Sequence, residues 1–370
     1  MPQAPSELQR EAAHSIVRRY LDVRAGEDVV VESWDHTMAM ASAMVDEVRR
    51  AGGKALLIHQ DEDAWRRAID RKQYKLLGES SAPEWAATKA ADVWVMFWGP
   101  GDTDRIEQLP EKTFDKTVAW NWPWYEVARK AGLRGVRMTE GFVTEGRARK
   151  WGLDRERWQE SVLRASLLNP KELAKTGARL AKALSRGKKV RIAHPNGTDL
   201  EVALAGIRPR LLDGRPHPGD KRFGPYGMLA SVPAGSITCA LDSQTAEGSF
   251  RANRRTNIWW TWHSGGRLEF TEGRLTSCSL EEGGEGFSRE YERGTTGKDR
   301  ASALAFGLNP AAKDVPLLEQ VEEGSVSLTI GGNRGLGGTN RSNFFTWFSL
   351  ADAEVSIDGT PIVRDGRILP

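Results

Sequence analysis

The chain has 370 residues, of which 39% are hydrophobic and 28% charged, so it can bury a large core and is long enough for two domains. Lysine and arginine total 53 against 50 aspartates and glutamates, a formal net charge of +3, and no basic block typical of nucleic-acid binding occurs. Because neither a signal-peptide run nor a membrane-length apolar segment is present, we expect a cytoplasmic protein with no nucleic-acid or membrane partner.

The first half of the chain alternates helix and strand patterns. Apolar residues recur at helical spacing over 6–20 and 38–50. Short apolar runs typical of buried parallel strands lie at 29–31, 55–59 and 92–98. This alternation predicts a parallel α/β domain, which we place at residues 1–187.

The second half has a different composition. Charged helical stretches fill 154–186, and beyond Lys188 the chain becomes rich in glycine, serine and threonine. Short strand patterns follow at 190–193, 200–204, 267–270 and 325–330. They predict a mainly antiparallel, β-rich domain over residues 188–370.

Five motifs in the second half occur in a characteristic order. They are GTDLEVAL (197–204), VPAGSITCAL (232–241), FGLNP (306–310), GSVSLTIGGN (324–333) and TNRSNFFTWFSLADAEVSIDG (339–359). Together with the α/β pattern before them, they make nearly the whole chain resemble the thermophilic metallo-aminopeptidases, the aminopeptidase T or leucyl aminopeptidase-like family. The resemblance implies an α/β domain followed by a β-rich domain, and a homodimer.

The resemblance also implies a two-metal centre in the C-terminal domain, held by glutamates, histidines, a tyrosine and an aspartate. In this chain each matched position holds a different residue: Ser236 and Ala303 for glutamates, Ser327 and Phe345 for histidines, Arg334 for the tyrosine and Trp347 for the aspartate. None of these side chains is a usual metal ligand. We therefore expect no metal and no other cofactor, and a mechanism based on metal-activated water is unsupported.

The replaced positions predict an aromatic pocket for a small molecule. Phe345 and Trp347 are expected to make the former metal cavity tighter and more apolar, which suits a flat aromatic ligand. Arg334 and Arg341 are candidates for holding an anionic group of that ligand. Two further candidate binding residues lie in the VPAGSITCAL motif, Thr238 and Cys239.

Four side chains are candidates for chemistry without a metal. Ser236 and Ser327 provide hydroxyls, and a hydroxyl nucleophile needs a base within hydrogen-bonding reach. His263 and Asp242 are the candidate bases. The two cysteines, Cys239 and Cys278, are expected to remain free thiols in a reducing compartment.

Three classes of function remain open at this stage. We favour a metal-independent enzyme acting on a small aromatic or amino-acid-derived substrate. The first alternative is a non-catalytic binding or scaffolding homologue, since a fold can lose its chemistry. The second is an aminopeptidase or other hydrolase with a relocated metal site, for which His217 and His263 are available, although neither has a partner at close ligand spacing.

Overall fold

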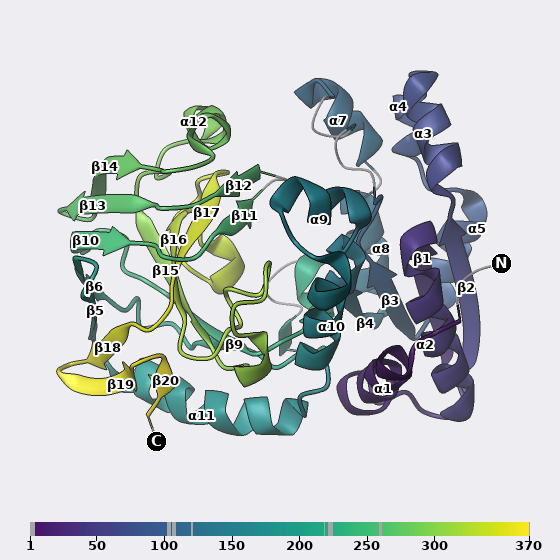
Figure 1. Ribbon diagram of the computed structural model, residues 1–370, viewed down its shortest axis with the longest axis horizontal. Helices are drawn as coiled ribbons and strands as arrows, with labels where there is room; N and C mark the ends of the chain where they lie inside the picture. The colour runs from purple at the N-terminus through teal and green to yellow at the C-terminus, as the bar shows by residue number, and fades with distance from the viewer. Residues whose placement is uncertain are drawn as a thin grey trace. The chain divides into compact units, whose positions relative to one another are not determined.

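The computed structural model describes residues 4–101, 105, 109–119, 121–217, 219–220, 225–258 and 261–369. The chain divides into two compact units, drawn as ribbons in Figure 1. The first unit comprises Met1–Asn169 and Gly214–Pro233, and the second comprises Pro170–Asp213 and Ala234–Pro370.

This division departs from the expected boundary between residues 187 and 188 in two places. Helix α11 (Pro170–Arg186) belongs to the second unit, because it packs on strands β7 (Arg210–Leu212) and β9 (Ser236–Ala240). Residues 214–233 return to the first unit, because strand β8 (Leu229–Val232) extends its sheet. Sequence composition changes at neither point, so tertiary packing alone places these segments.

A parallel sheet in the order β2-β1-β3-β4-β8 forms the centre of the first unit, within the described residues. Every neighbouring pair of strands in it runs parallel, which confirms the predicted α/β architecture. The three predicted strands of this unit coincide with three observed ones. The bounds are β1 (Asp28–Trp34), β2 (Lys54–Gln60), β3 (Val93–Phe97) and β4 (Arg134–Met138).

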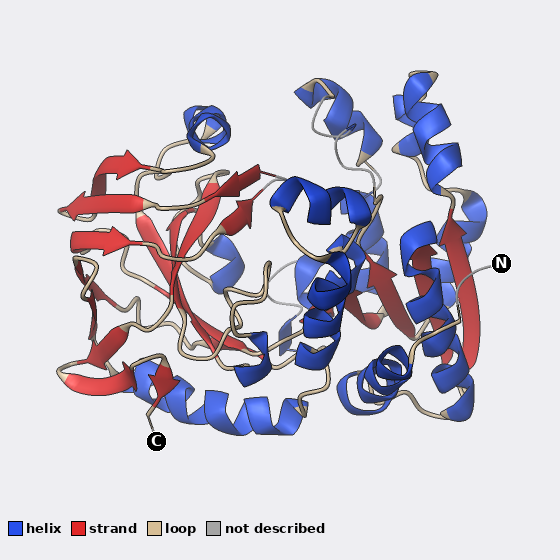
Figure 2. Cartoon of the chain, in the orientation of Figure 1, coloured by secondary structure: helices blue, strands red, loops and turns tan. Residues whose placement is uncertain are grey.

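Helices flank this parallel sheet, whereas strands dominate the second unit (Figure 2). Helix α2 packs against β1 and β2, while α5 and α8 pack together over the face that carries Val30 and Trp94. Within the described residues the helices are α1 (Glu7–Ser15) with a π-helical continuation (Ile16–Tyr20), α2 (Met38–Arg50), α3 (Glu62–Asp70), α4 (Tyr74–Leu77), α5 (Ala82–Ala90), α7 (Glu111–Thr117), α8 (Asn121–Ala131), α9 (Glu145–Trp151) and α10 (Arg155–Ala165).

Aromatic side chains make up much of the core on that face. The ring centroids of Trp94 and Trp124 lie 5.2 Å apart at an interplanar angle of 71°, and Tyr125 meets Trp124 at 5.2 Å and 83°. All three side chains are almost fully buried. Such edge-to-face pairs add stability beyond the area they bury, so they fix α8 against β3.

The second unit is built from antiparallel sheets, as the alternating strand patterns predict. The larger sheet of the described residues has the order β14-β13-β10-β6-β5-β18-β19-β20, and a second has the order β17-β16-β15-β9-β7. The remaining elements are β5 (Lys189–His194), β6 (Thr198–Ala203), β10 (Glu247–Arg251), β11 (Thr256–Ile258), β12 (Thr261–His263), β13 (Arg267–Thr271), β14 (Arg274–Ser279), α12 (Gly284–Arg293), β15 (Ala301–Gly307), β16 (Val326–Gly331), β17 (Phe345–Leu350), β18 (Glu354–Ile357), β19 (Thr360–Arg364) and β20 (Arg367–Ile368).

One face of the β17-β16-β15-β9-β7 sheet belongs to the core of this unit. Phe306 in β15 and Phe348 in β17 are fully buried, and both lie among aliphatic residues such as Leu304 and Leu328. Among the described helices of the whole chain, none combines the length and apolarity needed to cross a bilayer.

We expect Phe306→Ala to lower the free energy of unfolding of the second unit by about 3–5 kcal/mol, because it leaves a cavity at the centre of the sheet. Urea denaturation followed by circular dichroism measures this change. Phe345→Ala is the matched control, since Phe345 is 41% exposed and its truncation should change stability little. Equal losses in the two variants would contradict the core position of Phe306.

Candidate functional site

Strand register brings five of the six positions matched to metal ligands, all except Arg334, to one face of the β17-β16-β15-β9-β7 sheet. Thr238 lies opposite Ala305, which lies opposite Ser327 and then Ser349 on the next strands. The neighbouring row contains Ala240, Ala303, Thr329 and Trp347. Since directly opposed residues share a face and side chains alternate along a strand, one face carries Ser236, Thr238, Ala303, Ser327, Thr329, Phe345, Trp347 and Ser349. We call it the hydroxyl face.

The middle of the hydroxyl face is made of small side chains. Ala303 and Ala305 on β15 are buried, whereas Thr238 and Thr329 on the flanking strands are half-buried. Trp347 is also half-buried, and Phe345 is 41% exposed. Their rings stack with centroids 6.5 Å apart and planes inclined by 20°. The face therefore offers a flat aromatic surface beside hydroxyl groups.

Glu319, which precedes β16, lies against Trp347. Its Oε1 accepts a hydrogen bond from Trp347 Nε1 at 3.4 Å, and no hydrogen-bond donor among the described residues reaches its Oε2. The side chain is only 6% exposed. Burial raises the pKa of Glu319 to about 7, against the hydrogen bonds from its own backbone N–H and from Trp347. A carboxyl group with this pKa both donates and accepts protons near neutral pH.

Arg210 on β7 adds a guanidinium group to the same face. It lies directly opposite Thr238 in the sheet, so the two side chains project to the same side. Arginine binds carboxylates with two parallel hydrogen bonds, which makes Arg210 suited to an anionic group of a ligand.

The two candidate nucleophiles are both buried. Ser327 Oγ and Ser349 Oγ lie 2.6 Å apart and share a hydrogen bond, and neither side chain is exposed. Ser236 begins β9 and is 3% exposed. Both predicted serines therefore lie on the hydroxyl face, where Ser327 serves the contact between β16 and β17.

The two candidate bases lie away from these serines. His263 packs against Phe348, with ring centroids 4.9 Å apart, and Phe348 points to the opposite face from its neighbour Trp347. Burial lowers the pKa of His263 to about 4, so the ring is neutral at neutral pH. Asp242 is exposed beyond the far end of β9 from Ser236, roughly 20 Å along an extended chain. The expected pairing of a serine with either base is therefore not formed.

Cys239 points away from the hydroxyl face, because it lies between Thr238 and Ala240 on β9. Its thiol is free and buried, and burial raises its pKa to about 12. Cys278 is also free, and burial raises its pKa to about 11. Cys239 therefore belongs to the core and does not line the predicted binding surface.

The two candidate anion-binding arginines, Arg334 and Arg341, are exposed in the loop between β16 and β17. Buried asparagines shape this loop: Asn340 N donates to Asn333 Oδ1 at 3.0 Å, and Asn340 Nδ2 donates to Gly331 O at 2.7 Å. Asn340 thus has a structural role that does not require a metal.

The donor set of the hydroxyl face does not fit the two-metal centre that the sequence motifs imply. Where carboxylates and imidazoles are needed, the face presents hydroxyls, methyl groups and aromatic rings. Among the described residues that we place on the hydroxyl face, Glu319 is the one with a carboxylate. Within the described chain, the one cluster of three or more His, Cys, Asp or Glu side chains close enough to share a metal lies in the first unit: Asp35, His59 and Asp61.

That cluster is already engaged in protein contacts. His59 Nε2 lies 2.9 Å from Asp35 Oδ1, and Asp35 Oδ2 accepts a hydrogen bond from Glu62 N at 2.8 Å. Asp61 caps the first turn of α3 by accepting from Ala64 N. All three side chains are exposed, so we interpret them as a surface ion pair and a helix cap. His217 and His263 do not belong to this cluster.

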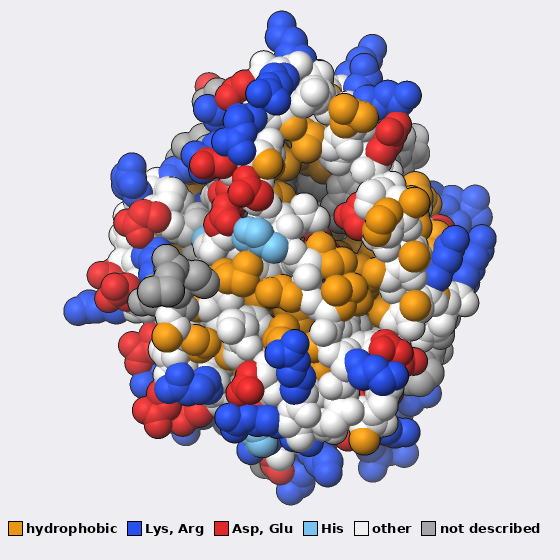
Figure 3. Space-filling view, turned by 90° about the vertical axis from the view of Figure 1, so that its right-hand side faces the viewer, with side chains coloured by type: hydrophobic (Ala, Val, Ile, Leu, Met, Phe, Trp, Pro, Cys, Tyr) orange, Lys and Arg blue, Asp and Glu red, His pale blue; other side chains and the backbone are white. Residues whose placement is uncertain are grey.

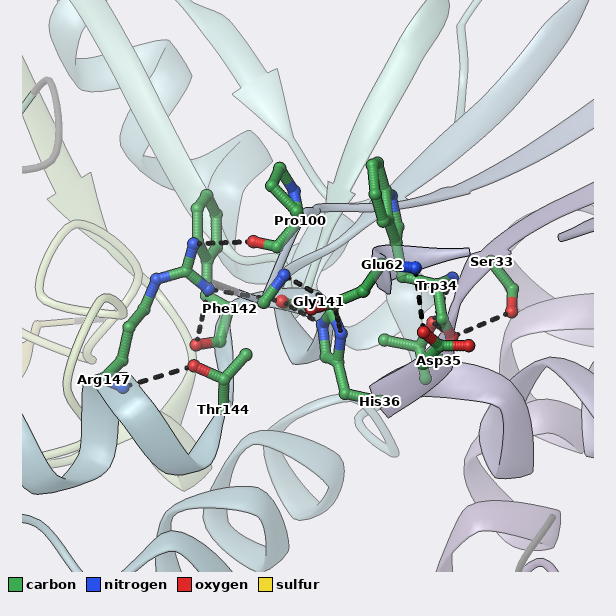
Figure 4. A network of polar contacts seen from close by, with 12 residues as sticks. Ser33, Trp34, Asp35, His36, Glu62, Pro100, Gly141, Phe142, Thr144 and Arg147 are labelled. Carbon is green, nitrogen blue, oxygen red and sulfur yellow. Dashed lines mark hydrogen bonds and ion pairs between the residues drawn. The ribbon is translucent and has the colours of Figure 1, made fainter. Parts of the chain in front are cut away.

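A buried polar network joins the carboxyl ends of the parallel strands in the first unit (Figure 4). His36, just after β1, places Nδ1 2.7 Å from Glu62 Oε1 and Nε2 2.9 Å from Gly141 O. Gly101 N, beyond β3, donates to the same Glu62 oxygen at 2.7 Å. Arg147 in α9 donates to the carbonyl oxygens of Phe142 at 3.0 Å and of Pro100 at 3.4 Å. The loops after β1, β3 and β4 are thereby held together.

The charges in this network satisfy one another. Gly141 O and an ionised Glu62 both accept hydrogen bonds, and each lies within hydrogen-bonding distance of one ring nitrogen of His36. Burial acts to raise the pKa of Glu62, but the hydrogen bond and charge of His36 and the N–H of Gly101 outweigh it, and the pKa is lowered. We interpret this network as a brace for the loops.

Sequence analysis missed Glu319 and Arg210. Glu319 belongs to an irregular segment before β16, where no periodic pattern indicates which side chains meet the sheet. The sequence indicates the position of Arg210 only weakly. The segment RLL at 210–212 can form a short edge strand, which would place the side chains of Arg210 and Leu212 on one side.

We expect Glu319 to make the protein less stable as pH rises. Its pKa is about 7 in the folded chain and near its usual 4.5 in the unfolded chain, so the unfolded state loses its proton first. Between pH 4.5 and about 7 the wild type should therefore lose on the order of 3 kcal/mol relative to Glu319→Gln, whose side chain stays neutral. Urea denaturation of both proteins across this range tests it, with Glu323→Gln as the control. Parallel stability curves would argue against a protonated Glu319.

Comparisons with known proteins agree with this fold. No protein-family model matches the chain, and no curated protein matches its sequence. Its structure is similar to that of wild-type AmpT (aminopeptidase T) from Thermus thermophilus, with a TM-score of 0.75 and 18% identity over 98% of this chain and 99% of that chain. It is also similar to 2,5-dihydroxypyridine dioxygenase from Pseudomonas putida KT2440, with a TM-score of 0.63 and 14% identity over 100% of this chain and 98% of that one. These likenesses show a shared fold and a distant relationship to AmpT in structure.

Proposed function

We propose that this protein is a divergent relative of AmpT that works without the two-metal centre, as an enzyme acting on a small aromatic or amino-acid-derived substrate. The hydroxyl face of the second unit would be its binding surface. The observation that carries the proposal is the contact between buried Glu319 and half-buried Trp347, on the face where the sequence motifs place the replaced metal ligands.

The binding surface has an apolar part and a polar part. Trp347 and the exposed Phe345 provide stacked rings on which a flat substrate ring can lie. Thr238 and Arg210, opposite each other on β9 and β7, provide a hydroxyl and a guanidinium group for a substrate carboxylate. An aromatic amino acid or a derivative of one has both features.

Glu319 would carry the proton transfer. In its ionised form, Oε2 accepts a proton from a carbon or heteroatom of the bound substrate, and the resulting carboxylic acid returns that proton to a second atom of the substrate. Trp347 Nε1 holds the other oxygen in place through its hydrogen bond. This scheme needs no metal and supports isomerisation or another acid–base rearrangement.

The test uses a panel of aromatic amino acids and their N-acyl and hydroxylated derivatives. We expect saturation-transfer NMR to detect binding to the wild type, and Trp347→Ala to weaken it roughly tenfold or more, because the stacking surface is lost. Trp122→Ala, at an exposed tryptophan of α8 in the first unit, is the control and should bind as the wild type does. Unchanged binding by Trp347→Ala would refute the hydroxyl face as the site.

Turnover of the bound compounds separates an enzyme from a binding protein. We expect Glu319→Gln to bind normally and to lower kcat by a factor of about 10² to 10⁴, the usual contribution of one acid–base group. The kcat of the wild type should change with a pKa near 7, and this inflection should vanish in the variant. Binding to the wild type without turnover would instead identify a non-catalytic homologue.

A further inference from the structure

A second buried carboxylate, Glu322, lies three residues after Glu319. The backbone N–H groups of Val321 and Glu322 both donate to Leu318 O, at 2.9 Å each, so the chain makes a tight turn here. Glu319 is 6% exposed and Glu322 is 3% exposed. By contrast, acidic and basic side chains are intermixed on the surface shown in Figure 3, where water and salt screen their charges. Because buried charges are screened much less, the two glutamates depend on their immediate neighbours.

Arg254, between β10 and β11, binds Glu322 through two parallel hydrogen bonds. Its Nε donates to Glu322 Oε2 at 2.9 Å, and its Nη2 donates to Glu322 Oε1 at 2.6 Å. The backbone N–H of Arg254 donates to Ser349 O at 3.1 Å, which ties the arginine to β17. A bidentate pair of this kind fixes the orientation of a carboxylate and favours its ionised form. Glu322 is therefore an anchored anion.

Two more carboxylates lie near Arg254. Asp314 Oδ1 lies 2.8 Å from Arg254 Nη2, but the side chain of Asp314 is 65% exposed. Asp352, in the turn between β17 and β18, is also exposed. The hydrogen bonds and charge of Glu322, together with the charges of Asp314 and Asp352, raise the pKa of Arg254. Its guanidinium group therefore stays charged across the whole range of pH in which a protein is folded.

Glu319 has the opposite surroundings. Burial raises the pKa of Glu319 to about 7, and the negative charge of Glu322 adds to this rise. Trp347 and the backbone N–H of Glu319 donate hydrogen bonds to it, but we find no cation beside it among the described residues. One carboxylate of the pair is thus fixed as an anion, while the other takes up a proton near neutral pH. Surroundings that separate two carboxyl groups in this way are how enzymes assign acid–base roles.

The backbone just before Glu319 is strained. Leu317 has a φ of 71°, a left-handed value that a bulky side chain adopts rarely and at a cost in free energy. Contacts on the other side of Glu319 offset this cost: buried Ser325 Oγ donates to Glu319 O at 2.7 Å, and the guanidinium group holds Glu322. Strain that the surroundings maintain in this way is typical of functional sites.

We propose that Arg254 is a positioning residue of the acid–base site, which acts on Glu319 through Glu322. By pairing with Glu322, it leaves Glu319 as the one group of the two that exchanges a proton with the substrate. It also fixes the turn that holds Glu319 beside Trp347. The inference rests on the proposed function, because it assigns the control of the same acid–base group. Arg254 itself transfers no proton.

Two single variants test the proposal, because they should shift the titration of Glu319 in opposite directions. In Arg254→Met the two glutamates lose their cation and bind their first proton as a pair, so this step should move about one pH unit or more above that of the wild type. In Glu322→Gln the neighbouring anion is gone and Arg254 remains, so the step should move below that of the wild type. Carbon-13 NMR of Cδ-labelled glutamate measures both steps, and comparison with Glu319→Gln identifies the signal.

Three further variants separate charge from structure. Arg254→Met combined with Glu322→Gln removes both charges and should titrate near the wild type, and the control Glu323→Gln should titrate as the wild type does. Arg254→Lys keeps the charge but not the two parallel hydrogen bonds, so its kcat should fall while the inflection of kcat stays near pH 7. If Arg254→Met does not fold, the shift in Glu322→Gln decides.

Shifts of the two single variants in the same direction, or no shift in Glu322→Gln, would overturn the role of Arg254. The titration needs no substrate, so it is measured whether or not the aromatic compounds react. Absence of turnover in the wild type would therefore refute the proposed function separately, whereas turnover with an unshifted titration would refute the role of Arg254 alone.

Discussion

The candidate site depends on the strand register of the β17-β16-β15-β9-β7 sheet. Because side chains alternate between the faces of a strand, a shift by one residue would move every hydroxyl to the core and every core residue outward. The observed register puts Thr238 and Trp347 on one face and Cys239 and Phe348 on the other. Between Thr238 and Trp347, β15 contributes the small buried residues Ala303 and Ala305 to the same face.

The electrostatics of this surface depend on how its buried glutamates are neutralised. Several carboxylates can share a site only while cations compensate their charge. Here two nearby glutamates differ: Arg254 makes two hydrogen bonds to Glu322, at 2.9 and 2.6 Å, while burial raises the pKa of Glu319, beside which we find no cation among the described residues. A bound proton therefore neutralises Glu319, as Arg254 neutralises Glu322. Unlike an arginine, this proton can be transferred to another group.

Sequence patterns predicted the parts of this architecture that have a period. Helix α2 spans the predicted 38–50, and the two-residue period of a strand places Phe345 and Trp347 on one face of β17. Contacts between segments distant in the chain have no such period. For this reason the pattern could not show that His263 packs on Phe348, that Glu319 meets Trp347, or that residues 214–233 return to the first sheet.

Buried glutamates in the two units illustrate how the surroundings of a carboxylate indicate its role. Glu62 accepts from His36 and from Gly101 N, its pKa is lowered, and it joins loops that would otherwise separate. Glu319 has one hydrogen bond of 3.4 Å, an oxygen without a donor among the described residues, and a raised pKa. A fold gains stability from the first arrangement and loses it in the second. The proposed acid–base role of Glu319 rests on this costly carboxyl group lying beside a ring that solvent can reach.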